Sequence, residues 1–256
     1  MKVLVCYKWV IDEADIIPDE ESHTLNTSRA KYKISEIDRN AIELGVTLKE
    51  QTGCELQSLT IGKETKASLK DALSRGIDNA FYVETASEDS MGTAKVMAAA
   101  IKKLGDIDII ICGEGSSDNY SQQIGPRIAG MLGFQLATYA SAVNVNEHGL
   151  EIIRKLEDDI ETLYVKTPAV ITVVSDINTP KVPGMKQILS ARRKPTVELK
   201  LTDLGLSDND LISAVNVVKE GPSIMDRKQV KVNENGISVQ EAAQKLIQLL
   251  KNDKVI

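Results

Sequence analysis

The fold of this chain is decided by residues 107–126, which read Ile107-Asp108-Ile109-Ile110-Ile111-Cys112-Gly113-Glu114-Gly115-Ser116-Ser117-Asp118-Asn119-Tyr120-Ser121-Gln122-Gln123-Ile124-Gly125-Pro126. The first part is short, apolar and rich in isoleucine, which predicts a strand buried on both faces of a parallel sheet. A turn-rich loop follows, and apolar residues then recur at helical spacing from Ile124 to Leu132. Because Pro126 lacks an N–H group and is tolerated only in a first helical turn, this helix should begin near Gln122.

A strand, a loop of small residues and a helix start together form a potential anion site. Backbone N–H groups and the positive end of the helix dipole favour a phosphate there. The side chains of Ser121, Gln122 and Gln123 can add hydrogen bonds, and Gly125 would let a ligand approach the backbone closely. An ordinary strand-to-helix connection that binds nothing is an equally good interpretation, because neither a Walker pattern nor G-x-G-x-x-G is present.

Segments of strand type and helix type alternate before this stretch. Strands are predicted at residues 3–10, 55–61 and 80–84, and helices at about 35–52, 65–75 and 90–104. This alternation calls for an α/β fold with a doubly wound, mainly parallel, Rossmann-like sheet and right-handed crossovers. Residues 13–33 are polar and lack a clear period, so we expect an excursion that covers the edge where the strands end.

The pattern changes after Gly133. Strand-like segments at 140–145, 150–156 and 160–165 predict an antiparallel insertion at about 140–167 that includes a hairpin, and 168–174 reads as a strand returning to the main sheet. Residues 1–205 are therefore interpreted as an α/β nucleotide-binding domain with a proline-stiffened loop at about 179–195. Residues 206–256 are predicted to form an arm that docks on a partner, because its final amphipathic helix has no visible partner layer within the chain.

Composition and charge exclude several classes of function. The chain has 256 residues, 42% of them apolar, and a net charge of −6, which argues against a nucleic-acid partner. No apolar run approaches the roughly 20 residues that span a bilayer, so no membrane insertion is expected. The first residues enter a strand without the features of a secretory signal, and we expect the protein in the cytoplasm.

Neither a metal site nor a catalytic residue is predicted. The three cysteines are odd in number and widely spaced, which suggests neither a disulfide framework nor a C-x-x-C metal site. The two histidines, His23 and His148, lie in polar stretches, which makes a histidine-ligated metal or a Ser-His-Asp triad improbable.

Several segments resemble the electron-transfer flavoprotein beta subunit. Its signature region resembles Arg154-Lys155-Leu156-Glu157-Asp158-Asp159-Ile160-Glu161-Thr162-Leu163 and Ile188-Leu189-Ser190-Ala191-Arg192-Arg193-Lys194-Pro195, with Thr167-Pro168-Ala169-Val170 and Asn178-Thr179-Pro180-Lys181 between them. The opening Val5-Cys6-Tyr7-Lys8 and the stretch from Asp118 to Pro126 fit the same family in the same order. The resemblance covers the chain essentially end to end, and it is strongest to the Fix-type beta subunits linked to carnitine or acyl-CoA reduction.

The resemblance implies a partner and a cofactor. In this family the beta subunit pairs with an alpha subunit that holds an FAD, and the heterodimer carries electrons between flavin-containing dehydrogenases and a quinone or other reductase. The beta subunit holds an adenine nucleotide of its own: AMP in the simple carriers, a second FAD in the bifurcating ones. Carried over by position, the cofactor contacts fall on Cys6, Lys8, Ser35, Asp38, Ile61, Asp118, Asn119, Ser121, Gln122, Gln123, Ile124, Gly125 and Ala129, and the partner-recognition loop falls on Pro183, Gly184 and Met185.

Two features bear on which nucleotide is bound. Asp89-Ser90-Met91-Gly92-Thr93 resembles a segment that bifurcating members place beside their second flavin, so Asp89, Ser90 and Thr93 are candidate cofactor contacts; a plain helix cap by Asp89 or Ser90 is an equal alternative. Glu114 stands where many members have a cation. If it faces the site, it would disfavour the extra charge of a pyrophosphate by on the order of 1 kcal/mol. FAD is the favoured occupant and AMP the alternative.

A different class of function also fits the α/β pattern. A stand-alone regulatory protein could bind AMP or ATP as a signal, without any redox role. The region after Gly133 argues against this alternative, because a hairpin, a stiffened loop and a terminal arm suit a subunit that clasps a partner.

Overall fold

The structure is a computed structural model that describes all residues except 20, 86–88, 214, 223–228 and 234–235. The described residues form a nine-stranded sheet with the strand order β11-β10-β9-β12-β8-β1-β6-β7-β13. Its parallel centre contains β12 (Ala169–Val173), β8 (Ile109–Gly113), β1 (Lys2–Cys6), β6 (Glu55–Gly62) and β7 (Asn79–Glu84). The predicted doubly wound, mainly parallel α/β fold is confirmed.

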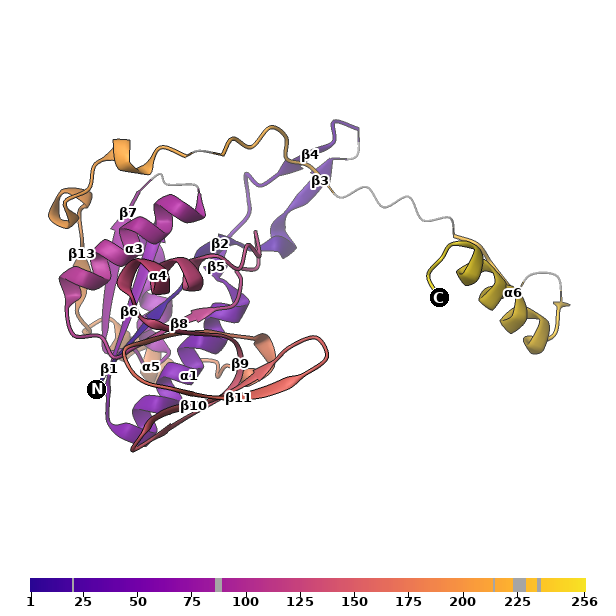
Figure 1. Cartoon of the computed structure of the whole chain (residues 1–256). Helices are drawn as coiled ribbons and strands as arrows, with labels where there is room; N and C mark the ends of the chain where they lie inside the picture. The colour runs from indigo at the N-terminus through magenta and orange to yellow at the C-terminus, as the bar shows by residue number, and fades with distance from the viewer. Residues whose placement is uncertain (20, 86–88, 214, 223–228, 234–235) are drawn as a thin grey trace.

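Helices cover both faces of this sheet (Figure 1). One face packs against α1 (Glu36–Thr52) and α2 (Leu69–Ser74), and the other against α3 (Ser90–Leu104) and α4 (Ile124–Leu132). Successive residues of β1 alternate between the two core clusters: Val3 and Val5 face α1, whereas Leu4 and Cys6 face α3 and α4. A strand covered on both faces is mostly apolar, which explains the continuous apolar runs of β1 and β8 in the sequence.

The first strand is shorter than predicted. It ends at Cys6, and a separate strand β2 (Trp9–Ile11) pairs with β5 (Tyr32–Ile34). The cause is at Lys8, whose backbone N–H donates to the Asp38 carboxylate instead of to a neighbouring strand. The excursion at residues 13–33 contains a further antiparallel pair, β3 (Ile17–Asp19) with β4 (Thr24–Asn26).

The antiparallel insertion is confirmed in β9 (Gln135–Asn146), β10 (Gly149–Lys155) and β11 (Ile160–Val165). The long strand β9 begins before the predicted residue 140. Its first part runs parallel to β12 and its second part antiparallel to β10, with register shifts on both sides. Beyond β12, helix α5 (Met185–Ala191) precedes β13 (Thr196–Glu198), which pairs with β7 and was not predicted because three residues carry no period.

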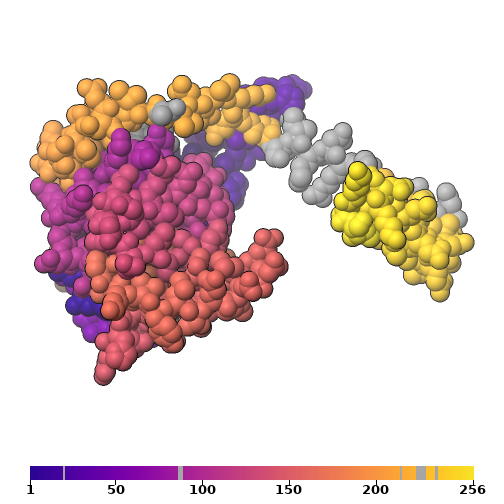
Figure 2. Space-filling view, in the orientation of Figure 1, coloured from indigo at the N-terminus to yellow at the C-terminus, as the bar shows by residue number. Residues whose placement is uncertain are grey.

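The segment after β13 first follows the body and then leaves it. Leu206 packs against the core cluster beside α3, Leu211 is 9% exposed, and the Nζ atom of Lys95 donates to the carbonyl of Asp210. In the described part of the chain, which includes all of α6 (Val239–Asn252), no residue of that helix is buried. Figures 1 and 2 show α6 apart from the α/β body. Residues 214, 223–228 and 234–235 of the predicted arm lie outside the described residues.

Among the described residues, no helix is both long enough and apolar enough to cross a membrane.

Truncation tests how the arm relates to the body. A chain ending at Ser213 should unfold within about 2 °C of the full chain, because it retains Leu206 and Leu211, and the described residues that it loses, including those of α6, are exposed or only partly buried. A chain ending at Gly205 should fold but unfold about 5 °C or more lower, because both leucines are lost. Calorimetry of the two truncated chains checks this. If the chain that ends at Ser213 failed to fold, or unfolded far below the full chain, the segment after Ser213 would have to pack on the body.

Candidate functional site

A buried carboxylate joins three elements at the edge where the parallel strands end, here called the carboxyl edge. Asp38 lies in the first turn of α1 and is 6% exposed. Its Oδ2 accepts the backbone N–H of Lys8, at 2.8 Å, and its Oδ1 accepts that of Gly113, at 3.0 Å. A side chain at Gly113 would lie 2.6 Å from this Oδ1, so only glycine fits. Asp38 therefore holds the ends of β1 and β8 against the start of α1.

Burial dominates the ionisation of this carboxylate. It raises the pKa of Asp38 to about 7, although the N–H groups of Lys8 and Gly113 oppose the rise. Because the pKa is raised in the folded state, the contribution of Asp38 to stability is largest below its ordinary pKa and falls as the pH rises towards 7. Near neutral pH the two N–H donors then have to stabilise a substantially ionised, buried group.

Two further contacts fasten the loop after β8. The Nζ atom of Lys8 forms an ion pair with Oδ2 of Asp118, at 2.5 Å, and both side chains are partly exposed. Burial raises the pKa of Asp118, but the hydrogen bonds from Lys8 and Ser116 and the charge of Lys8 together outweigh it, so the pKa is lowered. Ser35, at the N-cap of α1, accepts the backbone N–H of Ser117 at 3.1 Å instead of capping its own helix. The loop is thus held from β1 and from α1.

The starts of α3 and α4 meet at the same edge. Asp89 caps α3 by accepting the N–H of Gly92. The side-chain oxygen of Gln123, the N-cap residue of α4, accepts from the hydroxyl of Ser90, at 2.7 Å, and from Nε and Nη2 of Arg127, at 3.1 and 2.7 Å. The positive end of α3 is occupied by the Asp89 carboxylate, whereas the start of α4 has no side-chain cap and lies beside the guanidinium of Arg127. The start of α4 is therefore the helix end suited to an anion.

Glu114 does not face this edge. The residue is 4% exposed, and its Oε2 accepts the backbone N–H of Tyr139, at 2.8 Å, and the hydroxyl of Thr172. The expectation that Glu114 would repel a pyrophosphate assumed an exposed carboxylate and does not apply. Nothing in the local sequence indicated this, because both partners come from strands more than 20 residues away.

The predicted cofactor residues fall into two groups. One group presents polar atoms at the carboxyl edge or exposed positions beside it: Lys8, Ser35, Asp89, Ser90, Asp118, Asn119, Ser121, Gln122 and Gln123, with Asp38 beneath them. In the other group, Cys6, Ile61 and Ala129 are buried and Ile124 is partly buried in the cluster shared with α3, and Gly125 is buried in the first turn of α4. Thr93 is half-buried in the first turn of α3. Helix α4 begins at Ile124, close to the predicted start near Gln122, and Gln122 itself stays outside the helix with a φ of 57°.

Sequence reasoning missed four residues of the edge: Ser117, Arg127, Tyr139 and Thr172. Ser117 and Arg127 are near predicted residues, whereas Tyr139 and Thr172 lie on strands and gave no signal. The residues predicted to recognise a partner, Pro183, Gly184 and Met185, lie on another element, at the start of α5, where Met185 is 72% exposed.

A comparison with protein-family models matches residues 22–204 to the family described as the electron transfer flavoprotein domain. The match runs from the β3–β4 hairpin to the turn after β13. It includes most of the loops that meet at the carboxyl edge, together with the antiparallel insertion and α5.

Gly125 offers a direct test of how α4 is seated. An added Cβ would lie 2.2 Å from Cγ2 of Thr172, so the helix packs on β12 only with glycine there. Gly125→Ala should lower the free energy of unfolding by about 1 to 3 kcal/mol and weaken anion binding at the helix start. Denaturant unfolding and titration with AMP measure both effects.

Gly130→Ala is the matched control on the same helix. Nothing lies within 4 Å of an added Cβ at Gly130, and alanine favours a helix by up to about 1 kcal/mol over glycine. Equal stability of the two variants would show that α4 does not depend on this contact.

Proposed function

The chain belongs to the electron transfer flavoprotein domain family, and we propose that it is the beta subunit of a Fix-type electron-transfer flavoprotein. In this proposal it forms a heterodimer with an alpha subunit and carries electrons between a flavin-containing dehydrogenase and a quinone or other reductase. The protein acts by holding and positioning cofactors, without a catalytic acid or base.

The convergence of loops at the carboxyl edge carries this proposal. Strand β1 has β6 on one side and β8 on the other, so the chain reverses its direction of winding between β1 and β8. Open α/β sheets bind ligands at such a switch point. Asp38 accepts hydrogen bonds from Lys8, just after β1, and from Gly113, at the end of β8, which brings the loops 7–8 and 114–123 together at the strand ends.

The side chains at this edge fit an adenine nucleotide. Among the described residues, Arg127 has no carboxylate partner, and the buried hydroxyl of Ser117 has no hydrogen-bond partner. Arg127, Lys8 and the N–H groups at the start of α4 would hold phosphate, with Gln122 and Ser117 as further donors. A flavin bound there would supply the redox chemistry, and the chain would bind and orient it.

We propose FAD as the occupant, with possible electron bifurcation, and AMP as the alternative. The Fix-type resemblance and the segment 89–93 support FAD. Glu114 points inward and accepts hydrogen bonds from Tyr139 and Thr172, so it presents no exposed carboxylate to a second phosphate. Asp89 and Ser90 support FAD only through resemblance, since Asp89 also caps α3 and Ser90 also binds Gln123.

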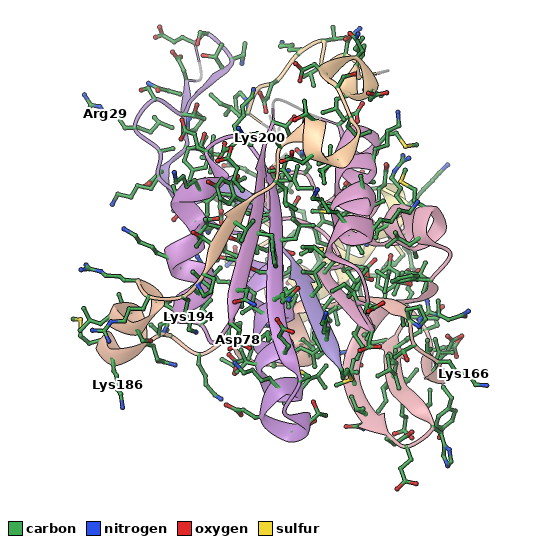
Figure 3. All side chains as sticks on the ribbon, turned by 90° about the vertical axis from the view of Figure 1, so that its left-hand side faces the viewer. Arg29, Asp78, Lys166, Lys186, Lys194 and Lys200 are labelled. Carbon is green, nitrogen blue, oxygen red and sulfur yellow. The ribbon has the colours of Figure 1, made fainter. Side chains whose placement is uncertain are left out.

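Helix α5 supports the proposed contact with the dehydrogenase. The helix exposes the apolar side chains of Met185, Ile188 and Leu189, and Val182, in the loop just before it, is exposed as well. The Nζ atom of Lys194 fastens the end of this segment to the body by donating to the carbonyls of Leu73 and Ile77, at 3.0 and 2.6 Å. Figure 3 shows Lys194 near Asp78 and Lys186 projecting from α5. We assign the exposed face of α6 to the alpha subunit.

Co-expression with a neighbouring reading frame tests the proposal. We expect a yellow heterodimer, and after denaturation two flavins per heterodimer and no AMP. One flavin with one AMP would overturn FAD as the occupant and keep the beta-subunit assignment. A colourless homodimer with a bound nucleotide would contradict the carrier function and favour the stand-alone regulator.

A further inference from the structure

Two residues with unusual backbone conformations are tied together beside the proposed nucleotide site. Gln122 and Tyr139 both have a φ of 57°, a left-handed conformation that non-glycine residues rarely adopt. The side-chain nitrogen Nε2 of Gln122 donates to the hydroxyl of Tyr139 at 2.9 Å. Strain of this kind persists only where surrounding contacts enforce it, and it clusters at functional sites.

Specific side-chain contacts hold the backbone on both sides of Tyr139. Oε2 of Glu114 accepts the Tyr139 N–H at 2.8 Å and also accepts the hydroxyl of Thr172. On the other side, Nε of Arg154 donates to the carbonyl of Thr138, at 2.8 Å. Strand β9 shifts register on both sides near this point, as at a β-bulge, a feature that redirects side chains near functional sites.

The same network sets the start of α4. Gln122 is the second residue before the helix begins at Ile124, so its backbone conformation determines where the first free N–H groups point. Thr172, which donates to Glu114, also lies against Gly125 in the first turn. The start of α4 is therefore held at two residues. Gln122 is linked to Glu114 through Tyr139, and Gly125 is linked to Glu114 through Thr172.

We propose that Tyr139 is a positioning residue for the nucleotide site: its hydroxyl holds Gln122 so that the start of α4 faces the phosphate, and Glu114 holds Tyr139. This inference rests on the proposed function and extends it to a strand that supplies none of the predicted contacts. Glu114 acts on the site from within the core. It does not contact the ligand but accepts a hydrogen bond from the backbone of β9.

The test measures AMP affinity by calorimetry on the full-length chain stripped of nucleotide. Tyr139→Phe removes only the hydroxyl, and we expect AMP to bind about three- to tenfold more weakly, the effect of one lost neutral hydrogen bond. The melting temperature of the nucleotide-free protein should change by less than about 2 °C. Tyr164→Phe, at a tyrosine that is 74% exposed on β11, is the matched control and should bind AMP as the wild type does.

A double-mutant cycle shows whether Tyr139 acts through Gln122. Gln122→Ala should weaken binding, and adding Tyr139→Phe to it should cause no further loss. Wild-type affinity in Tyr139→Phe, or losses that add in the double variant, would overturn the inference while leaving the nucleotide site in place. Failure of the wild-type chain to bind AMP or FAD at all would overturn the proposed function and this inference with it.

Discussion

The carboxyl edge depends on the hydrogen bonds that the buried carboxylate of Asp38 accepts from Lys8 and Gly113. A carboxylate removed from water is costly unless donors replace the lost hydration, and here the replacements are the N–H groups of Lys8 and Gly113. Because one donor lies just after β1 and the other is the last residue of β8, satisfying one buried group also fixes the loops on either side of the switch point. The early end of β1, the need for glycine at 113 and the position of the start of α1 follow from this one constraint.

Helix α1 connects the carboxyl edge to the segment that leads to α5. Two turns of it carry buried polar side chains that bind the segment leading to α5. Nδ2 of Asn40 donates to the carbonyls of Ser175 and Asn178, and Oε2 of Glu43 accepts the N–H of Lys181. One rigid helix therefore positions both the carboxyl edge, at its first turn, and the segment before α5, one turn later. A carrier that must hold a nucleotide and present a docking surface gains from such a shared support.

Much of this architecture could be predicted from the sequence. The apolar run at 109–112 and the alternation before it identified the parallel sheet, and the resemblance to electron-transfer flavoproteins agrees with the family match. The first strand was predicted too long because the backbone of Lys8 leaves the ladder for a distant carboxylate. Whether Glu114 faces the site could not be predicted, because its burial depends on strands that are distant in sequence. The subunit identity, the bound nucleotide and the docking role of the arm remain predictions.

Hydrogen–deuterium exchange of the full-length chain, with and without saturating AMP, tests most directly whether the carboxyl edge is the nucleotide site. We expect slower exchange in peptides covering residues 34–38 and 113–125, where α1, β8 and α4 meet, and no change in the hairpin at residues 150–165. Protection confined to other parts of the chain, or no protection in these two segments at full saturation, would contradict the account.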